Sequence, residues 1–393
     1  MLVLVAPGQG AQTPGFLTPW LELPGFRNRL HWLGTCAGLD LVRFGTEADA
    51  DEIRDTAVTQ PLLVAASLVS ALALFPHPVD AFRKVGAVAG HSVGEIAAAA
   101  GAGVISAEQA MVFVRERGEA MAAAADRTPT GMTAVLGGEQ DAVLAKLEEY
   151  GLTPANINGA GQVVAAGAFP DLEKLKGDPP EGARLRPLQV AGAFHTSYMG
   201  SAVDGLRAYA SAMTTRDPRT RVLSNYDGSV VHSGTEVLDR VVEQVAAPVR
   251  WDQVMGTMSD LGVTAVIEMP PAGTLTGLIK RALPGVETLA LKTPDGLPRA
   301  KQLVEEHGEP SPLENQPTWR LVVAPAAGTF RRGDAEPGST VPTGGEIGSL
   351  VARRNEQPIT ARHGGTVVEW LVEDGDPVSP GQPLVRLHPE VSS

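Results

Sequence analysis

The sequence contains a serine whose neighbours favour a nucleophilic role. Ser92 lies in the stretch Gly-His-Ser-Val-Gly (90–94), which fits the pattern G-x-S-x-G. In this pattern the glycines permit a strained turn from a strand into a helix, which lifts the serine hydroxyl out of the sheet. A plain glycine-rich turn is the alternative. The apolar run before Ser92 and the alanine-rich, helix-forming stretch after it favour the nucleophile.

A nucleophilic serine needs oxyanion donors and a base. The backbone N–H of Val93, at the start of the helix, can donate to a developing oxyanion, and the N–H of Gln9, in the loop after the first apolar run, is a candidate second donor. His195, in AGAFHTSYM (191–199), is the candidate base, because it stands where an inserted segment returns to the main sheet. A hydrogen-bonded core histidine explains His195 equally well.

An arginine on the following helix could bind an acid-bearing substrate. Arg117 and Met121 are four residues apart and therefore share one helical face, whereas Arg115 points elsewhere. A guanidinium in a cleft binds a carboxylate through two parallel hydrogen bonds. An ordinary solvated helix charge is the other interpretation, and composition does not decide between them.

The elements around Ser92 predict an α/β fold with a parallel sheet. Residues 85–90 and 265–271 read as short buried strands, and residues 273–283 read as the helix after the second of them. Between 128 and 191 the order reads β-α-β-β-α-β, which is typical of a ferredoxin-like subdomain. We therefore expect an α/β-hydrolase-like part formed by 1–127 and 192–300, with 128–191 inserted beside a cleft.

The C-terminal part of the sequence contains an internal repeat. Residues 301–319 are polar and proline-containing, which predicts a linker. After it, residues 324–350 align without a gap on residues 361–387, because 361 minus 324 and 387 minus 350 both give 37. Glycines coincide at matched points, which indicates matched turns. We expect residues 320–389 to form an all-β domain of two similar halves, since neither half could bury its apolar side alone.

Composition excludes several classes of function. The formal net charge is −13 and no basic run occurs, which argues against a nucleic-acid partner. The single cysteine, Cys36, excludes an internal disulfide and a C-x-x-C metal site, and it suits a reducing cytosol. The apolar start lacks the basic flank of a signal peptide, and no window approaches about 18 uninterrupted apolar residues. We therefore expect a soluble cytoplasmic protein with no metal and no membrane span.

Nine motifs occur in order along residues 1–300. They are PGQGAQ (7–12), TQPLL (59–63), GHSVGE (90–95), RERGEAM (115–121), PANINGAGQVVAAG (154–167), AGAFHTSYM (191–199), SNYDG (224–228), EQVAAPVRW (243–251) and PPAGTLTGL (270–278). Together they resemble the malonyl-CoA:acyl carrier protein transacylases. The resemblance implies transfer of a malonyl group from malonyl-CoA to acyl carrier protein through a malonyl ester on Ser92, with His195 as base and no cofactor.

The resemblance also assigns roles to other residues. In the family a backbone carbonyl, here that of Gln244, orients the histidine in place of a triad acid. Arg117 aligns with the arginine that holds the malonyl carboxylate. Phe194 looks like the residue of malonyl-preferring members, whereas methylmalonyl-preferring relatives tend to carry serine there. The remaining carried-over positions are the oxyanion donors Gln9 and Val93, the pocket residues Gln60 and Met121, and Asn156 and Asn158 near the pantetheine entrance; the usual serine of the first motif is Ala11 here.

The C-terminal repeat resembles a biotinyl or lipoyl carrier domain, a flattened β-barrel of two similar halves. The modified lysine of such domains lies on the hairpin between the halves, here residues 351–359, and its position falls near Arg354. No lysine follows Lys301, so the resemblance implies a domain without biotin or lipoate. A docking module for carboxylase or synthase partners and a passive appendage are equally good hypotheses for its role.

Three other functions compete with malonyl transfer. A serine hydrolase shares the elbow and the oxyanion site but passes the acyl group to water. An acyltransferase for another extender unit, such as methylmalonyl, would use the same residues. A non-catalytic scaffold is suggested by the lysine-free C-terminal domain, although a scaffold has no need of Ser92, His195, Arg117 and Gln60 together. Fatty acid synthesis and polyketide synthesis both remain open as the pathway.

Overall fold

A computed structural model describes residues 1–310, 320–352 and 355–389, and the chain forms two compact units. The first unit is Met1–Glu314 and the second is Asn315–Ser393. All the candidate site residues of the sequence lie in the first unit, and the internal repeat lies in the second. The expected separation of an α/β part from an all-β part is therefore present in the structure.

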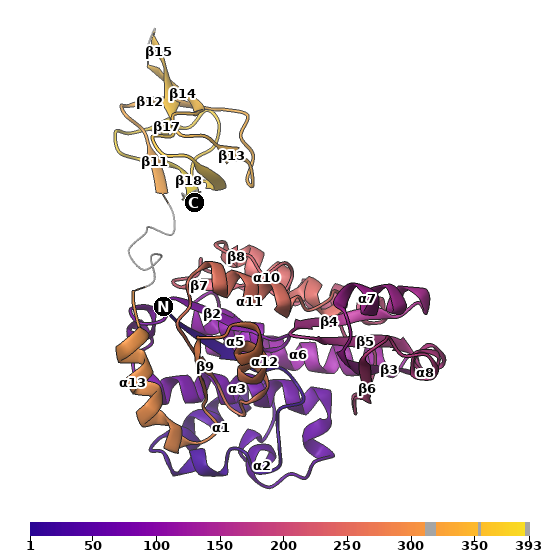
Figure 1. Ribbon diagram of the computed structural model, residues 1–393. Coiled ribbons are helices and arrows are strands. Elements are labelled where there is room, and N and C mark those ends of the chain that lie inside the picture. The colour runs from indigo at the N-terminus through magenta and orange to yellow at the C-terminus, as the bar shows by residue number, and fades with distance from the viewer. Residues whose placement is uncertain (311–319, 353–354, 390–393) are drawn as a thin grey trace. The chain divides into compact units, whose positions relative to one another are not determined.

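A six-stranded sheet forms the centre of the first unit, in the order β10-β9-β1-β2-β7-β8 (Figure 1). All neighbouring strands are parallel except β7 and β8. The expected parallel sheet is thus a mixed one, because the turn from β7 to β8 is too short for the crossover that a parallel pair needs. The strands are β1 (Leu2–Ala6), β2 (Ala87–Gly90), β7 (Arg221–Leu223), β8 (Val230–Val231), β9 (Ala265–Glu268) and β10 (Glu287–Ala290).

Helices bury both faces of this sheet. Leu2 and Leu4 of β1 pack on one face with α1, α3, α5 and α6, whereas Val3 and Val5 pack on the other face with α11 and α12. This alternation explains why the central strands are apolar throughout. The helices of this part are α1 (Phe26–Ala37), α2 (Leu41–Thr46), α3 (Thr56–Leu74), α4 (Pro78–Phe82), α5 (Gly94–Gly101), α6 (Ala107–Ala125), α9 (Gly200–Ser211), α10 (Gly234–Glu243), α11 (Trp251–Asp260), α12 (Thr274–Ala282) and α13 (Leu297–His307), with 3-10 helices η1 (Thr18–Glu22), η2 (Glu52–Arg54), η3 (Ser197–Met199), η4 (Gln244–Ala246) and η5 (Pro294–Gly296).

One helix, α3, is long and apolar enough to count as a candidate membrane span, although the sequence has no uninterrupted apolar run of that length. The helix α3 has 19 residues and enough mean hydropathy to cross a bilayer by length and composition alone. Polar residues such as Thr59 and Gln60 interrupt its apolar run, so a count of uninterrupted apolar residues misses it. Of its most apolar window, 72% is buried inside the protein, and α3 is therefore a core helix of this unit.

The inserted subdomain has the β-α-β-β-α-β order expected from the sequence. Its four-stranded sheet has the order β4-β5-β3-β6, with all neighbours antiparallel. Val249, just before α11, forms a bridge with Asn156 of β4 and so joins the subdomain to the main part. The elements are β3 (Thr130–Gly137), α7 (Gln140–Glu149), β4 (Thr153–Gly159), β5 (Gln162–Ala168), α8 (Phe169–Gly177) and β6 (Ala183–Pro187).

The segment predicted as a linker, 301–319, begins as a helix. The helix α13 extends to His307, and Leu303 and Val304 on it are buried in the main core. The sequence does not predict this helix because the segment as a whole is polar and proline-containing, and its two buried apolar residues do not stand out. Residues 311–319 of the predicted linker lie outside the described part of the chain.

The described residues of the second unit form two four-stranded sheets whose strands follow the internal repeat. The sheet orders are β11-β18-β16-β13 and β15-β14-β12-β17. The first strands of the two aligned copies, β12 and β16, start at equivalent positions, Gly328 and Gly365, and the later strands correspond in the same way. Arg354, near the expected modification position, lies outside the described residues. The strands are β11 (Arg320–Val323), β12 (Gly328–Arg332), β13 (Thr340–Val341), β14 (Glu346–Ala352), β15 (Asn355–Thr360), β16 (Gly365–Trp370), β17 (Pro377–Val378) and β18 (Pro383–Pro389).

Candidate active site

Ser92 lies on the tight turn between strand β2 and helix α5. Its φ is +53°, in the left-handed region that serine rarely adopts. The two glycines of the motif make this turn possible. A Cβ at Gly90 would overlap the carbonyl group of Gly94, and a Cβ at Gly94 would overlap the carbonyl oxygen of Ala6 in β1. The spacing G-x-S-x-G is therefore a steric requirement of the strand-to-helix turn that presents Ser92.

His195 lies in the loop between β6 and η3, with its ring between Ser92 and Gln244. The distance from Ser92 Oγ to His195 Nε2 is 2.8 Å, and the distance from His195 Nδ1 to the Gln244 carbonyl oxygen is 2.9 Å. A carbonyl oxygen only accepts, so Nδ1 must carry the proton and Nε2 presents its lone pair to the serine hydroxyl. This arrangement can take a proton from Ser92.

The surroundings of His195 keep its imidazole neutral. The side chain is 4% exposed. Burial, aided by the positive charge of Arg117, lowers its pKa from 6.5 to about 3, against the opposing hydrogen bond to the Gln244 carbonyl. At neutral pH the ring is therefore unprotonated, which is the form that a general base needs.

Arg117 lies on α6 with its guanidinium against the serine. It is 1% exposed, and burial lowers its pKa from the ordinary value of arginine to about 10, so that it stays charged at neutral pH. Its donors reach Gln60 Oε1 at 2.6 Å, Ser92 Oγ at 3.3 Å and Gln244 Oε1 at 3.4 Å. All three acceptors are neutral, and its Nε is buried without an acceptor among the described residues. This guanidinium can therefore still bind an anion.

Two further side chains that the sequence points to, Gln60 and Phe194, are buried in this unit. Gln60 of α3 is buried, and its Nε2 lies 3.4 Å from Met121 Sδ on α6. Phe194, beside the histidine, is 6% exposed and packs in the main core. Arg115, two positions from Arg117, is paired with Glu116. The helical face that the sequence assigns to Arg117 and Met121 is thus the buried one.

Two backbone N–H groups, one in the elbow and one in a loop that runs close to it, are candidates to bind an oxyanion. Val93 is the N-cap residue of α5, directly after Ser92, and Gln9 lies in the loop after β1. Neither N–H donates a hydrogen bond within the part of the chain that the structure describes. The loop of Gln9 runs close to the elbow, since a Cβ on Gly8 would lie 2.9 Å from the carbonyl oxygen of His91.

The inserted subdomain contacts the elbow through His91. The Nε2 atom of His91 lies 2.9 Å from Asn158 Oδ1 on β4, and its ring packs at 5.6 Å from that of Trp251. Burial lowers the pKa of His91, so this histidine is a neutral structural contact. Asn156, on the same strand, has a buried side-chain oxygen without a donor among the described residues.

Asn225 and Glu95 lie within the motifs SNYDG and GHSVGE, but the sequence alone assigns these two residues no role. Asn225 accepts a hydrogen bond from the Ser92 N–H at 2.8 Å and donates to the Gly90 carbonyl at 2.7 Å. Its own N–H donates to Glu95 Oε1 at 2.7 Å. Burial raises the pKa of Glu95 from 4.5 to about 8. The signal that could have identified them is polar residues beside the elbow and at the end of the neighbouring strand β7.

One cluster outside this site has the composition of a metal site. Glu287, Glu306 and His307 bring their side-chain ligand atoms within 4.8 Å of one another. Arg299 already forms ion pairs with both glutamates, and His307 Nδ1 lies 2.9 Å from Thr264 Oγ1. The cluster is therefore explained as a surface ion-pair network.

Comparisons with known proteins agree with this geometry. The profile of the family "Acyl transferase domain" matches residues 3–298. The malonyl CoA-acyl carrier protein transacylase of Mycobacterium tuberculosis is 52% identical over 297 residues, covering 76% of this chain and 98% of the relative. That of Escherichia coli is 32% identical over 307 residues, with 76% and 98% covered.

Solved structures give the same result. The crystal structure of MCAT from Mycobacterium tuberculosis is similar with a TM-score of 0.74 at 51% identity, covering 77% of this chain and 99% of that one. A malonyl-transacylase in complex with a type II PKS acyl-carrier protein is similar with a TM-score of 0.71 at 28% identity, with 77% and 99% covered. Together with the serine, histidine and arginine described above, these matches show that the chain belongs to the acyl transferase family and is an acyltransferase related to the malonyl CoA-acyl carrier protein transacylases.

Proposed function

We propose that this acyltransferase moves the malonyl group of malonyl-CoA to the phosphopantetheine thiol of an acyl carrier protein, through an ester on Ser92. The observation that carries the proposal is the buried charge of Arg117, which has no ion-pair partner among the described residues and lies 3.3 Å from the serine hydroxyl that contacts His195. A hydrolase or transferase of neutral acyl groups has no use for a buried cation beside its nucleophile, whereas a malonyl carboxylate does.

In the first half-reaction the Ser92 hydroxyl attacks the thioester carbonyl of malonyl-CoA while its proton moves to His195 Nε2. The carbonyl oxygen becomes an oxyanion, which the N–H groups of Gln9 and Val93 stabilise. The carbon–sulfur bond then breaks, and His195 returns the proton to the leaving thiol. Arg117 holds the malonyl carboxylate during both steps.

The second half-reaction uses the same groups in reverse. His195 takes the proton of the phosphopantetheine thiol, the sulfur attacks the ester carbonyl, and the oxyanion forms again at the same two N–H groups. The ester bond breaks, and His195 returns the proton to Ser92 Oγ. We assign Gln244 to the orientation of His195, Gln60 and Met121 to the support of Arg117, and Asn156 and Asn158 to the pantetheine entrance.

The identity of the acyl group is part of the proposal. Phe194 is a bulky side chain next to the base, and we infer that it crowds an α-methyl group and so favours malonyl over methylmalonyl. Equal concentrations of malonyl-CoA and methylmalonyl-CoA, offered together, test this directly. A preference for methylmalonyl in the transferred product would contradict the role given to Phe194.

The proposed function is tested by the intact mass of the protein. Mixing with malonyl-CoA should add one malonyl group, which Ser92→Ala abolishes, and subsequent addition of phosphopantetheinylated carrier protein should move the group to the carrier. Release of free malonate alone would favour a serine hydrolase. The absence of any adduct would favour a non-catalytic scaffold.

The second unit and the cellular setting complete the proposal. We infer that residues 320–389 form a biotinyl- or lipoyl-like barrel without an attachable lysine, because strands of the two copies match and no lysine follows Lys301. Affinity capture with this unit present and with it removed separates the two hypotheses for its role. A docking role predicts that carboxylase or synthase partners are captured only when the unit is present, and a passive role predicts no difference. We also propose that the inserted subdomain is ferredoxin-like, that the protein acts in the cytoplasm without a cofactor, and that it supplies fatty acid or polyketide synthesis.

A further inference from the structure

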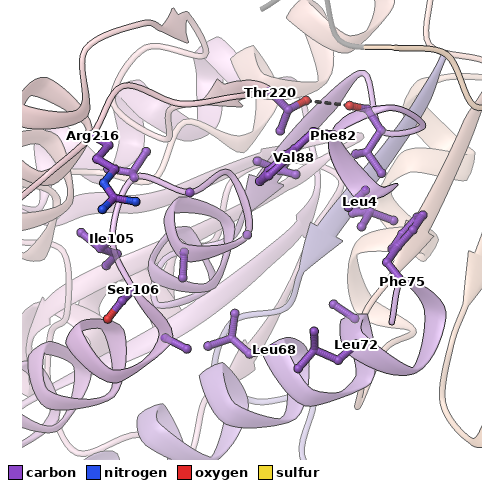
Figure 2. A pocket seen from close by; sticks show the side chains of 18 of the residues that line it. Leu4, Leu68, Leu72, Phe75, Phe82, Val88, Ile105, Ser106, Arg216 and Thr220 are labelled. Carbon is purple, nitrogen blue, oxygen red and sulfur yellow. Dashed lines mark hydrogen bonds between the residues drawn. The ribbon is translucent and has the colours of Figure 1, made fainter. Parts of the chain in front are cut away.

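A cavity of about 590 Å³ that Ser92 does not line lies in the first unit, and it is called the α3 cavity here (Figure 2). Leu68, Ala71 and Leu72 line it from α3; their spacing of three and four residues places them on one helical face. Leu4 of β1 and Val88 of β2 line it from the sheet. None of the residues assigned to acyl transfer is among its lining residues.

The wall of the α3 cavity is predominantly apolar, and three of its polar side chains, those of Ser106, Gln109 and Thr220, already have partners. Ser106 Oγ accepts from the Gln109 N–H at 3.1 Å, and Gln109 Nε2 donates to the Thr214 carbonyl at 3.2 Å. The Thr220 hydroxyl donates to the Val85 carbonyl at 2.6 Å (Figure 2). Water in a protein cavity needs two to four polar partners, so this wall suits an apolar occupant better than a water cluster.

One cation lies at the polar end of the α3 cavity. Figure 2 shows Arg216 next to Ile105 and Ser106, at the opposite side from Phe75. The Arg216 N–H donates to the Val104 carbonyl at 2.9 Å, which fixes its backbone to the cavity wall. Its guanidinium forms no hydrogen bond or ion pair within residues 1–310, 320–352 and 355–389. A free guanidinium binds a carboxylate in a two-pronged geometry.

These features together select a ligand chemistry. The volume is within the range of about 300–1,000 Å³ that small-molecule sites occupy, and such sites are mostly apolar with a few placed polar groups. A single cation at one end matches one negative charge, and the apolar wall matches a hydrocarbon body. We propose that the α3 cavity binds a medium- or long-chain fatty acid, with its hydrocarbon chain along α3 and its carboxylate on Arg216.

Dodecanoate, titrated calorimetrically below its micelle concentration into the full chain, tests the proposal. The unmodified protein should bind one equivalent, and dodecanol should bind less tightly than dodecanoate. Arg216→Gln should weaken dodecanoate about three- to five-fold, since a solvent-exposed ion pair contributes about 1 kcal/mol at most. Ala71→Phe, which places a ring in the cavity, should weaken it at least ten-fold. Arg127→Gln, a change of another exposed arginine, should leave binding unchanged.

Three results would overturn the fatty-acid site. They are no saturable binding by the unmodified protein, equal affinity of the Ala71→Phe variant, and loss of dodecanoate binding when malonyl-CoA is saturating. The last result would assign dodecanoate to the pocket of Ser92 instead. Arg216→Gln and Ala71→Phe change no residue assigned to acyl transfer. Both variants should therefore keep the malonyl transfer rate of the unmodified protein, and an unchanged rate also shows that they are folded.

Discussion

Replacing Arg117 by methionine should change the acyl preference of the enzyme more than its folded structure. Methionine keeps an unbranched side chain in the buried position but removes the charge. In the unmodified protein, Arg117 is 1% exposed, so the malonyl carboxylate that we propose it binds would be paired in a nearly desolvated site. Removing one partner of a buried ion pair costs about 3–5 kcal/mol, which corresponds to a loss of roughly 10²- to 10⁴-fold in kcat/KM for malonyl-CoA.

Acetyl-CoA has no carboxylate, so its transfer should change by less than about ten-fold, the equivalent of about 1.4 kcal/mol. The charge of Arg117 also helps to lower the pKa of His195, so the acidic limb of the acetyl-transfer pH profile should move to higher pH in Arg117→Met. The measurement is single-turnover acylation of Ser92 with each donor, followed by intact mass across pH 4–8.

Arg115→Met is the matched control, because Arg115 is on the same helix and is paired with Glu116. It should leave both donors within about three-fold of the unmodified rates, since Arg115 and Glu116 form a half-buried ion pair with each other and are not among the residues assigned to acyl transfer. Equal losses for malonyl and acetyl transfer in Arg117→Met would refute the reasoning. That result would mean that Arg117 holds the positions of Gln60 and Gln244 and does not select the acyl group.

Three further changes test other parts of the site. Asn225→Ala leaves the Ser92 N–H and the Gly90 carbonyl without their partner. Each unsatisfied buried group costs about 1–3 kcal/mol, so the variant should have a lower thermal midpoint and a kcat that falls more than KM rises. Unchanged steady-state kinetics would contradict this expectation. The raised pKa of Glu95 means that, between about pH 5 and 8, the folded state holds a proton that the unfolded state has lost, so the free energy of unfolding should fall by about 1.4 kcal/mol per pH unit. Urea titrations at several pH values should show a smaller slope in Glu95→Gln. An unchanged slope would contradict the expectation. A chain ending at residue 314 keeps the whole first unit and should transfer malonyl at the rate of the full chain, whereas a large loss of rate would give the second unit a catalytic role.

The features that the sequence predicts well are those that depend on residues close together in the chain. The elbow depends on two glycines within five residues, and the internal repeat depends on glycines at matched positions in adjacent copies. The subdomain was recognisable because each of its elements carries its own periodicity. His195 could be named but not distinguished from a core histidine, because that choice depends on Ser92, which is 103 positions away.

The features that the sequence does not predict depend on distant contacts. Asn225 reaches Ser92 across 133 positions, and only the pairing of β2 with β7 brings the two together. The helical start of the predicted linker needs the core contacts of Leu303 and Val304. The raised pKa of Glu95 follows from burial, and a glutamate in a helix of alanines gives no sign of it in the sequence.

The uncharged neighbours of Arg117 explain how the site can keep a cation ready for an acid-bearing substrate. Gln60 and Gln244 supply amide oxygens, which accept hydrogen bonds but do not neutralise the guanidinium. A carboxylate in either place would form a permanent ion pair and compete with malonyl. Glu95 is the buried acid whose charge acts on Arg117, and its pKa of about 8 keeps most of it protonated at neutral pH. Burial therefore has two effects here: it removes the hydration of Arg117, and it keeps Glu95 largely uncharged. The positive charge of Arg117 thus stays available for the carboxylate of the substrate.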